Sequence, residues 1–176
     1  MTAPAGMTRF NLEDVCRAND EWGCNCGPAA VAAIMDMTLD DARPHMSDFE
    51  AKGYTNPTTM FAALKNIGRP WREIGPRDHT VGRPWPTYGL ARIQWEGPWT
   101  KPGVPMRARY RSTHWVGSAS REDGAIGVFD VNAIGNGSGW VSLKDWARIV
   151  VPSILETFKR ADGKWYITHA IEVERR

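Results

Sequence analysis

The pattern of apolar and polar residues changes its period about halfway along the chain. Between residues 56 and 68 the apolar residues recur at the three- and four-residue spacing of a helix. Between residues 91 and 95 they alternate with polar residues, which is typical of a strand. Helices followed by strands predict an α+β fold, with N-terminal helices and a C-terminal antiparallel sheet.

Three helices are expected in the first half. Pro28 is suited to the first turn of a helix, and the run AAVAAIM behind it predicts a helix at about 26–37. The segment Thr38–Asp41 resembles a capping box for a short second helix, which Pro44 would limit. A third helix should open at Asn56–Pro57 and stop at Gly68.

The second half is expected to form strands. HWVGSAS and AIGVFDV, joined by the turn residues 121–124, predict an antiparallel hairpin. Residues 133–139 indicate a loop, and residues 142–145 indicate the cap of a helix that Pro152 would kink or end. The segments ETFKR and KWYITHAIEV predict a closing hairpin.

The composition excludes several functional classes. The formal charge of +2 and the scattered basic residues give no electrostatic case for nucleic acid. No apolar run approaches the ~20 residues that span a bilayer, and the start of the chain lacks a signal pattern, so a cytoplasmic protein is expected. Three cysteines, an odd number, fit a reducing compartment. The nine tryptophans should fill the core, and some should line a groove.

The cysteines suggest a nucleophile more than a metal or redox site. A zinc site needs four ligands, and a dithiol motif needs Cys-x-x-Cys, but the chain offers only Cys24-Asn25-Cys26, so we expect no metal and no cofactor. Cys26 falls at the start of the predicted helix, where unpaired N–H groups favour the thiolate and an oxyanion. Cys24 lacks this support. The alternative is that all three cysteines are buried apolar side chains.

A thiol nucleophile needs a base, and the base needs an orienting partner. His114 opens one strand of the predicted hairpin, and Asp130 ends the other. Antiparallel pairing would bring Asp130 beside the imidazole, with Asn132 as the second choice for the orienting role. The residues therefore suggest a Cys26–His114–Asp130 triad. The alternative for each residue taken alone is a structural role.

The segments NCGPAAVAAI, HWVGS and VFDVNA, in this order, resemble the papain-like cysteine peptidases that process double-glycine bacteriocin leaders. The resemblance covers roughly residues 15–150. It implies one papain-like domain over residues 1–176, with a helical part at about 10–70, an antiparallel sheet at about 87–176 and a cleft between them. Cys26 would be the nucleophile, His114 the base and Asp130 the orienting residue.

One position departs from that family. The family usually carries a glutamine six residues before the cysteine, and its amide donates a hydrogen bond to the oxyanion. Here Asp20 occupies this position, and Asn19 lies one residue further away. Both are oxyanion-site candidates, although a carboxylate would repel an oxyanion, and the loss of one donor costs ~10² to 10³ in turnover.

Two functional hypotheses follow. The first is a cysteine peptidase or amide hydrolase that acts on a peptide or protein substrate, with thiol transferase work or cell-wall peptide cleavage as variants. The second is an inactive papain-like scaffold that binds an oligomeric or assembly partner, for instance in a virus particle of phage type. The cleft walls would come from loops such as 97–112, whose sequence does not name the substrate.

Overall fold

A computed structural model describes residues 3–23, 25–75, 84–95, 103, 113–157 and 164–175, and for residues 48 and 134–136 it describes the backbone alone. Cys24, most of the loop 97–112 and residues 158–163 therefore lie outside the described residues. No helix in the described ranges is both long and apolar enough to cross a membrane.

The described strands form one antiparallel sheet in the order β1-β6-β2-β3-β4-β5. The strands are β1 (Trp71–Ile74), β2 (Tyr88–Gln94), β3 (Thr113–Ser120), β4 (Ile126–Phe129), β5 (Trp140–Ser142) and β6 (Tyr166–Val173). The central strands β2 and β3 are almost entirely buried, because helices cover both faces of the sheet.

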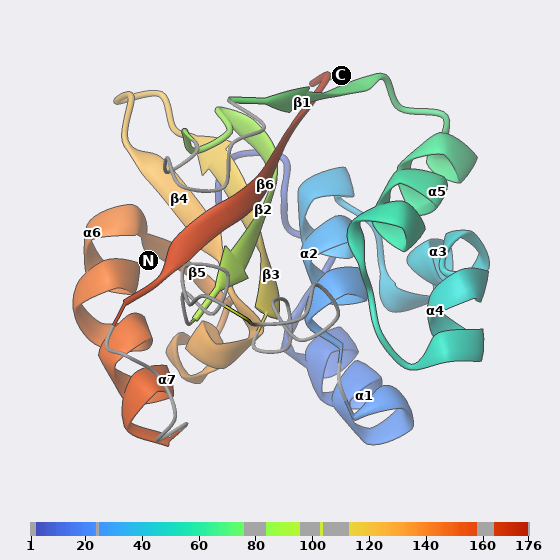
Figure 1. Ribbon diagram of the computed structural model, residues 1–176, viewed down its shortest axis with the longest axis horizontal. Helices are drawn as coiled ribbons and strands as arrows, with labels where there is room; N and C mark the ends of the chain where they lie inside the picture. Colours follow the sequence, from blue (N-terminus) through green and yellow to red (C-terminus); the bar gives the residue numbers. More distant parts are fainter. Residues whose placement is uncertain are drawn as a thin grey trace.

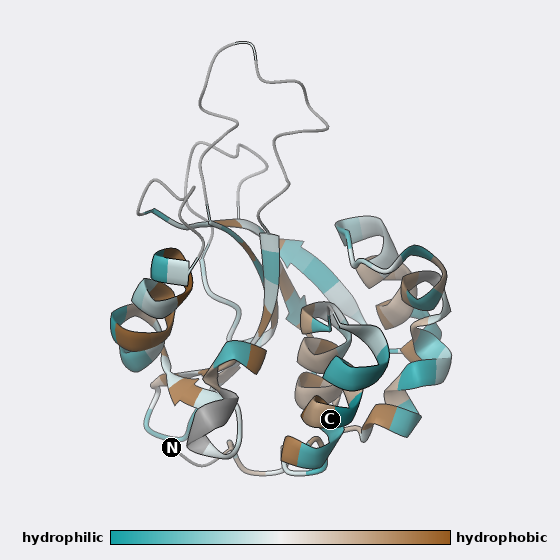
Figure 2. Cartoon of the chain, turned by 90° about the horizontal axis from the view of Figure 1, so that it is seen from below, coloured by the Kyte–Doolittle hydropathy of each residue, from teal (hydrophilic) through white to brown (hydrophobic). Residues whose placement is uncertain are grey.

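Helices lie on both sides of this sheet (Figure 1). They are α1 (Leu12–Trp22), α2 (Cys26–Met35), α3 (Leu39–Ala42), α4 (Ser47–Lys52), α5 (Pro57–Ile67), α6 (Leu143–Asp145) and α7 (Val151–Thr157). A 3₁₀ turn at Arg43–His45 follows α3, and a π-helix at Trp146–Val150 joins α6 to α7. The view from below shows α1–α5 on one side of the curved sheet and α6–α7 on the other (Figure 2).

Two hydrophobic cores result from this layering. The first lies between the sheet and α1–α5, with α2 at its centre, and nine of the ten residues of α2 are buried. The second lies between the opposite face of the sheet and α6–α7. Adjacent residues of β3 enter different cores, since Trp115 belongs to the first and Val116 to the second.

Most of the predicted elements are present. α2 begins at Cys26 and ends at Met35, two residues before the expected end at about 37, because the C-cap residue Asp36 adopts a left-handed conformation with φ 51°. The capping box at Thr38–Asp41 is formed, and α5 opens at Asn56 and stops at Gly68 as predicted. β3 and β4 pair as the predicted hairpin.

Four expectations were wrong. The first strand of the predicted closing hairpin is not formed by Glu156 and Thr157, because these residues end α7. The second strand is present as β6, and it pairs with β1 and β2 instead. β1 joins the sheet ahead of the predicted boundary at about 87. Residues 131–136 form a 3₁₀ helix in place of part of the loop. Pro152 does not end the helix, since the π-helix passes directly into α7, whose second residue is this proline.

Candidate active site

Cys26 is the first residue of α2. Its side chain is half-buried, and both Cys16 and Cys26 are thiols. The side chain of the N-cap residue Asn25 makes no cap hydrogen bond, and its Nδ2 atom donates to the carbonyl of Val15 in α1, at 3.5 Å. The N–H dipoles of the first turn therefore act on the cysteine, and they favour its thiolate form.

The C-terminal half of α2 lies against the far part of β3. A Cβ atom added to Gly117 would come within 2.9 Å of Cγ1 of Ile34, so the glycine allows the helix to approach the strand closely. The Tyr88 hydroxyl donates to the carbonyl of Ile34, and Tyr88 is paired with Ala119 near the end of β3. Ile34 is thereby fixed beside residues 117–119.

The N-terminal end of α2 lies near the start of the same strand. A Cβ atom at Gly27 would overlap the side chain of Thr55, which shows how closely the two residues pack. The carbonyl of Thr55 accepts a hydrogen bond of 2.9 Å from Nε1 of Trp115. Helix and strand thus run in the same direction, and Cys26 lies at the end of β3 that carries His114.

His114 is buried and hydrogen-bonded to Asp130. Its Nε2 atom lies 2.8 Å from Oδ1 of Asp130, which is fully buried just after β4. A carboxylate can only accept, so Nε2 carries the proton and donates it. Nδ1 is therefore the ring nitrogen that has a lone pair to receive a proton.

The strand alternation gives His114 its surroundings. Because Trp115 faces α2, the side chain of His114 leaves β3 on the opposite face. There its ring lies 6.0 Å from that of Trp95. His114 is the second residue of β3, so its ring stands at the strand end and not in the middle of the sheet.

Asn132, the second candidate for the orienting role, supports Asp130. Its backbone N–H and its Nδ2 atom donate to Oδ1 of Asp130, at 2.8 and 3.0 Å. Nδ2 also lies 3.3 Å from Nε2 of His114, but two donor groups do not form a hydrogen bond with each other. Asp130 is thus the residue that holds the imidazole, and Asn132 secures the carboxylate.

Trp146 is a further partner of Asp130 that the sequence pattern did not reveal. Its Nε1 atom donates to Oδ2 of Asp130 at 2.7 Å, and its side chain is fully buried. It opens the π-helix, a helix type that is frequent at functional sites. Nothing in the spacing of residues 142–152 indicated this contact, although the abundance of tryptophan was visible.

Three more tryptophans surround this indole. Trp85, Trp95 and Trp165 lie with ring centroids 5.5, 6.0 and 5.1 Å from that of Trp146. We call these four residues, with Trp146 at the centre, the tryptophan cluster. Through Trp146 the cluster is linked to Asp130, whose side chain is fully buried.

The pKa of the Asp130 carboxyl is held below its usual range. Burial raises this pKa, but the charge of His114 and the hydrogen bonds from His114, Trp146 and the Asn132 backbone together outweigh burial. Asp130 is therefore ionised at neutral pH and can accept from both His114 and Trp146.

The two oxyanion candidates are placed on α1. Asn19 and Asp20 are both exposed, in the last turn of this helix, and the carbonyl of Asn19 accepts the N–H of Gly23. Neither makes a described side-chain hydrogen bond to α2. The structure therefore brings His114, Asp130 and Asn132 together, but it does not draw Asn19 or Asp20 into the same contacts.

Gln94 is a buried polar residue that the strand pattern did not single out. It was expected on the polar side of an alternating strand, yet it is fully buried at the end of β2, opposite Thr113. Neither its amide nitrogen nor its amide oxygen has a hydrogen-bond partner among the described residues, which is rare for a buried side chain.

No protein-family model matches this chain, and no curated protein matches its sequence. Within the described ranges, no group of three or more His, Cys, Asp or Glu side chains is arranged to hold a metal ion.

Proposed function

We propose that the protein is a cysteine peptidase or amide hydrolase of papain-like fold, with Cys26 as nucleophile, His114 as base and Asp130 as the orienting residue. The observation that carries this proposal is the buried His114–Asp130 hydrogen bond of 2.8 Å, which leaves Nδ1 as the proton acceptor. The position of Cys26 at the first residue of α2, near the end of β3 that carries His114, supports it.

The reaction would proceed in two steps. The thiol proton of Cys26 passes to Nδ1 of His114, and the sulfur attacks the substrate carbonyl while the first-turn N–H groups of α2 stabilise the oxyanion. The C–N bond then breaks, and His114 returns the proton to the leaving amine. Water attacks the thioester, the acid product leaves, and the thiol is restored.

The geometry sets one requirement for this mechanism. His114 leaves β3 on the face opposite α2, so its ring must reach Cys26 around the end of the strand. His114 is the second residue of β3, so in this proposal its ring passes the end of the strand at Thr113.

Alkylation by iodoacetamide tests the proposed nucleophile. Cys26 should be labelled faster than Cys16 near neutral pH, although Cys16 is the more exposed thiol, because a thiolate is the reactive form. His114→Ala should abolish this preference, and Asn132→Ala should reduce it less. Equal, slow labelling of all three cysteines in the wild-type protein would contradict the proposal.

Hydrolysis itself is tested with a library of internally quenched peptides. The wild-type protein should cleave some members, whereas Cys26→Ala should cleave none. Cys26→Ser is a useful matched variant, because it keeps the volume and the helix start but raises the pKa of the nucleophile far above neutrality.

One observation favours the second candidate, an inactive scaffold. Asn19 and Asp20 are exposed on α1, so no side-chain amide replaces the expected glutamine there. An inactive scaffold should show reactive Cys26 labelling without turnover, and its oligomeric state, measured by size exclusion with light scattering, should be the same in Cys26→Ala as in the wild type. Cleavage of any peptide that depends on Cys26 would exclude this alternative.

A further inference from the structure

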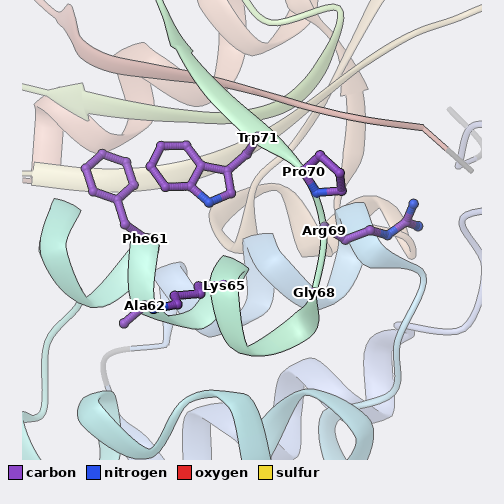
Figure 3. A pocket seen from close by; sticks show the side chains of 7 residues that line it. All are labelled: Phe61, Ala62, Lys65, Gly68, Arg69, Pro70 and Trp71. Atoms are coloured by element: carbon purple, nitrogen blue, oxygen red, sulfur yellow. The ribbon is translucent and has the colours of Figure 1, made fainter.

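A groove on the surface lies between the second half of α5 and the start of β1, where the two meet through Gly68–Pro70 (Figure 3). Its volume is about 570 Å³, which is within the range of pockets that bind small ligands or single side chains of a partner. α5 begins beside Thr55, close to the start of α2, and leads away from it, so the groove is separate from the candidate active site.

The floor of the groove is aromatic. The rings of Phe61 and Trp71 are stacked, with centroids 4.4 Å apart and planes inclined by 7°. Both side chains are half-buried, and Pro70 continues the apolar surface beside them. Half-buried aromatic rings of this kind are common anchors for a partner's side chain. Trp71 is thus one of the tryptophans that line a groove.

The walls of the groove are basic. Lys65 comes from α5, and Arg69 comes from the connection to β1 (Figure 3). Nη1 of Arg69 donates to the carbonyl of Glu174 at 3.2 Å, which holds the guanidinium in place while its other N–H groups can bind a ligand. None of the described residues that line the groove is acidic, and neither cation forms an ion pair with a described residue.

We propose that this groove binds an acidic peptide segment, whose apolar or aromatic side chain lies on Phe61 and Trp71 and whose carboxylates meet Lys65 and Arg69. The charge of the lining and its aromatic floor match these two parts of the ligand. Two cations are too few for a polyphosphate track, and the chain as a whole has a formal charge of only +2, so a peptide fits better than a nucleic acid.

Fluorescence anisotropy with labelled octapeptides tests this proposal. The panel has a central Phe, Trp or Leu that is flanked by Asp and Glu, by Asn and Gln, or by Lys, and an octamer of deoxythymidine is measured alongside. The protein carries Cys26→Ala, so that no peptide is cleaved and the result does not depend on catalysis. We expect the affinity for the acidic peptides to be at least about tenfold higher than that for the neutral peptides. Added salt should lower the affinity for the acidic peptides, because it screens the charges.

Charge variants locate the binding. Lys65→Ala should weaken binding of the acidic peptides about threefold to tenfold, and Lys65→Glu should weaken it further. Trp71→Ala should weaken the binding of the acidic and the neutral peptides alike, because it removes one of the two aromatic rings that form the floor of the groove. Lys144→Ala is the matched control, since Lys144 is an exposed lysine of α6 on the other side of the sheet, and it should leave the affinity unchanged.

Four results would overturn the proposal. These are no saturable binding of any acidic peptide at millimolar concentration, equal binding of acidic and neutral peptides, equal effects of Lys65→Ala and Lys144→Ala, or tighter binding of the oligonucleotide than of the acidic peptides. Circular dichroism of each variant separates binding from folding. If Lys65 serves only the C-terminal end of α5, its substitution will lower the melting temperature and leave peptide binding unchanged, which also overturns the proposal.

Discussion

Trp146 helps to fix the orientation of Asp130, which is hydrogen-bonded to His114. Its indole N–H occupies Oδ2, so Oδ1 is left for His114 and Asn132. In the proposed mechanism it is a positioning residue, because it contacts the carboxylate and not the reacting atoms.

Trp146→Phe removes this N–H and keeps an aromatic ring. We expect kcat to fall about tenfold with little change in KM, since a hydrogen bond to a charged group contributes ~1.5 to 3 kcal/mol. The pKa of Asp130 should rise toward its usual value, which moves the acidic limb of the pH–rate profile to higher pH. The profile is measured with a cleaved peptide from the library.

Trp165→Phe is the matched control for this prediction. Trp165 packs edge-to-face on Trp146 at 5.1 Å, and it donates no described hydrogen bond to Asp130. If both substitutions shift the pH profile equally, then packing within the tryptophan cluster, and not the hydrogen bond, holds Asp130.

Asp130 also links stability to pH. Its pKa in the folded protein is below the value of 3.8 for an ordinary aspartate, so its ionised form stabilises the fold above that value, and this contribution is lost as the pH falls through the folded pKa. In urea unfolding, Asp130→Asn should be less stable than the wild type at pH 6.5, and the difference should shrink at pH 3. Glu122→Gln, in an exposed turn, is the control, and a difference that is independent of pH would contradict this link.

At the scale of elements, the contact between α2 and β3 positions the candidate nucleophile. The helix can approach the strand because Gly117 has no side chain. A larger residue at this position would push the helix away, and Cys26 would move with it.

Gly117→Ala should destabilise the protein by ~1 to 3 kcal/mol, because the added Cβ would lie 2.9 Å from Cγ1 of Ile34 and 3.2 Å from Cβ of Phe129. Ile34→Val in the same chain should recover part of the loss, which a double-mutant cycle of urea unfolding measures. Gly127→Ala on β4 is the control, since its Cβ would make ordinary contacts from 3.4 Å outward. Equal losses for the two glycines would show that packing against α2 is not the cause.

At the scale of the whole molecule, β2 and β3 contribute side chains to both cores. Leu90 enters the core under α2, whereas Ala91 enters the core under α6–α7. The loss of either helical layer would expose one face of these central strands, so the two cores should be lost together.

We therefore expect a single unfolding transition in urea. Far-UV circular dichroism reports on the helices of both layers, whereas tryptophan fluorescence reports on the packing of both cores, since Trp115 and Trp140 belong to the first and Trp95 and Trp146 to the second. The two curves should have the same midpoint and the same slope. Separate midpoints would mean that the protein does not unfold in one cooperative step and would contradict this prediction.

The sequence by itself determined the local features of this protein. The start of α2 at Cys26, the capping box at Thr38 and the stop of α5 at Gly68 are encoded within a few residues, because caps and helix ends are local interactions. The β3–β4 hairpin is also local, and its register made the approach of His114 and Asp130 foreseeable.

The tertiary structure decided the features that depend on distant residues. The place of β1 at the edge of the sheet, the hydrogen bond of Trp146 to Asp130, the burial of Gln94 and the groove between Phe61 and Trp71 all join segments that the local pattern does not relate. Alternation of apolar and polar residues shows which side of a strand is apolar. It does not show that helices cover both faces of the sheet. The helices on each face determine which residues surround a buried polar group, so these surroundings could not be predicted from the local pattern.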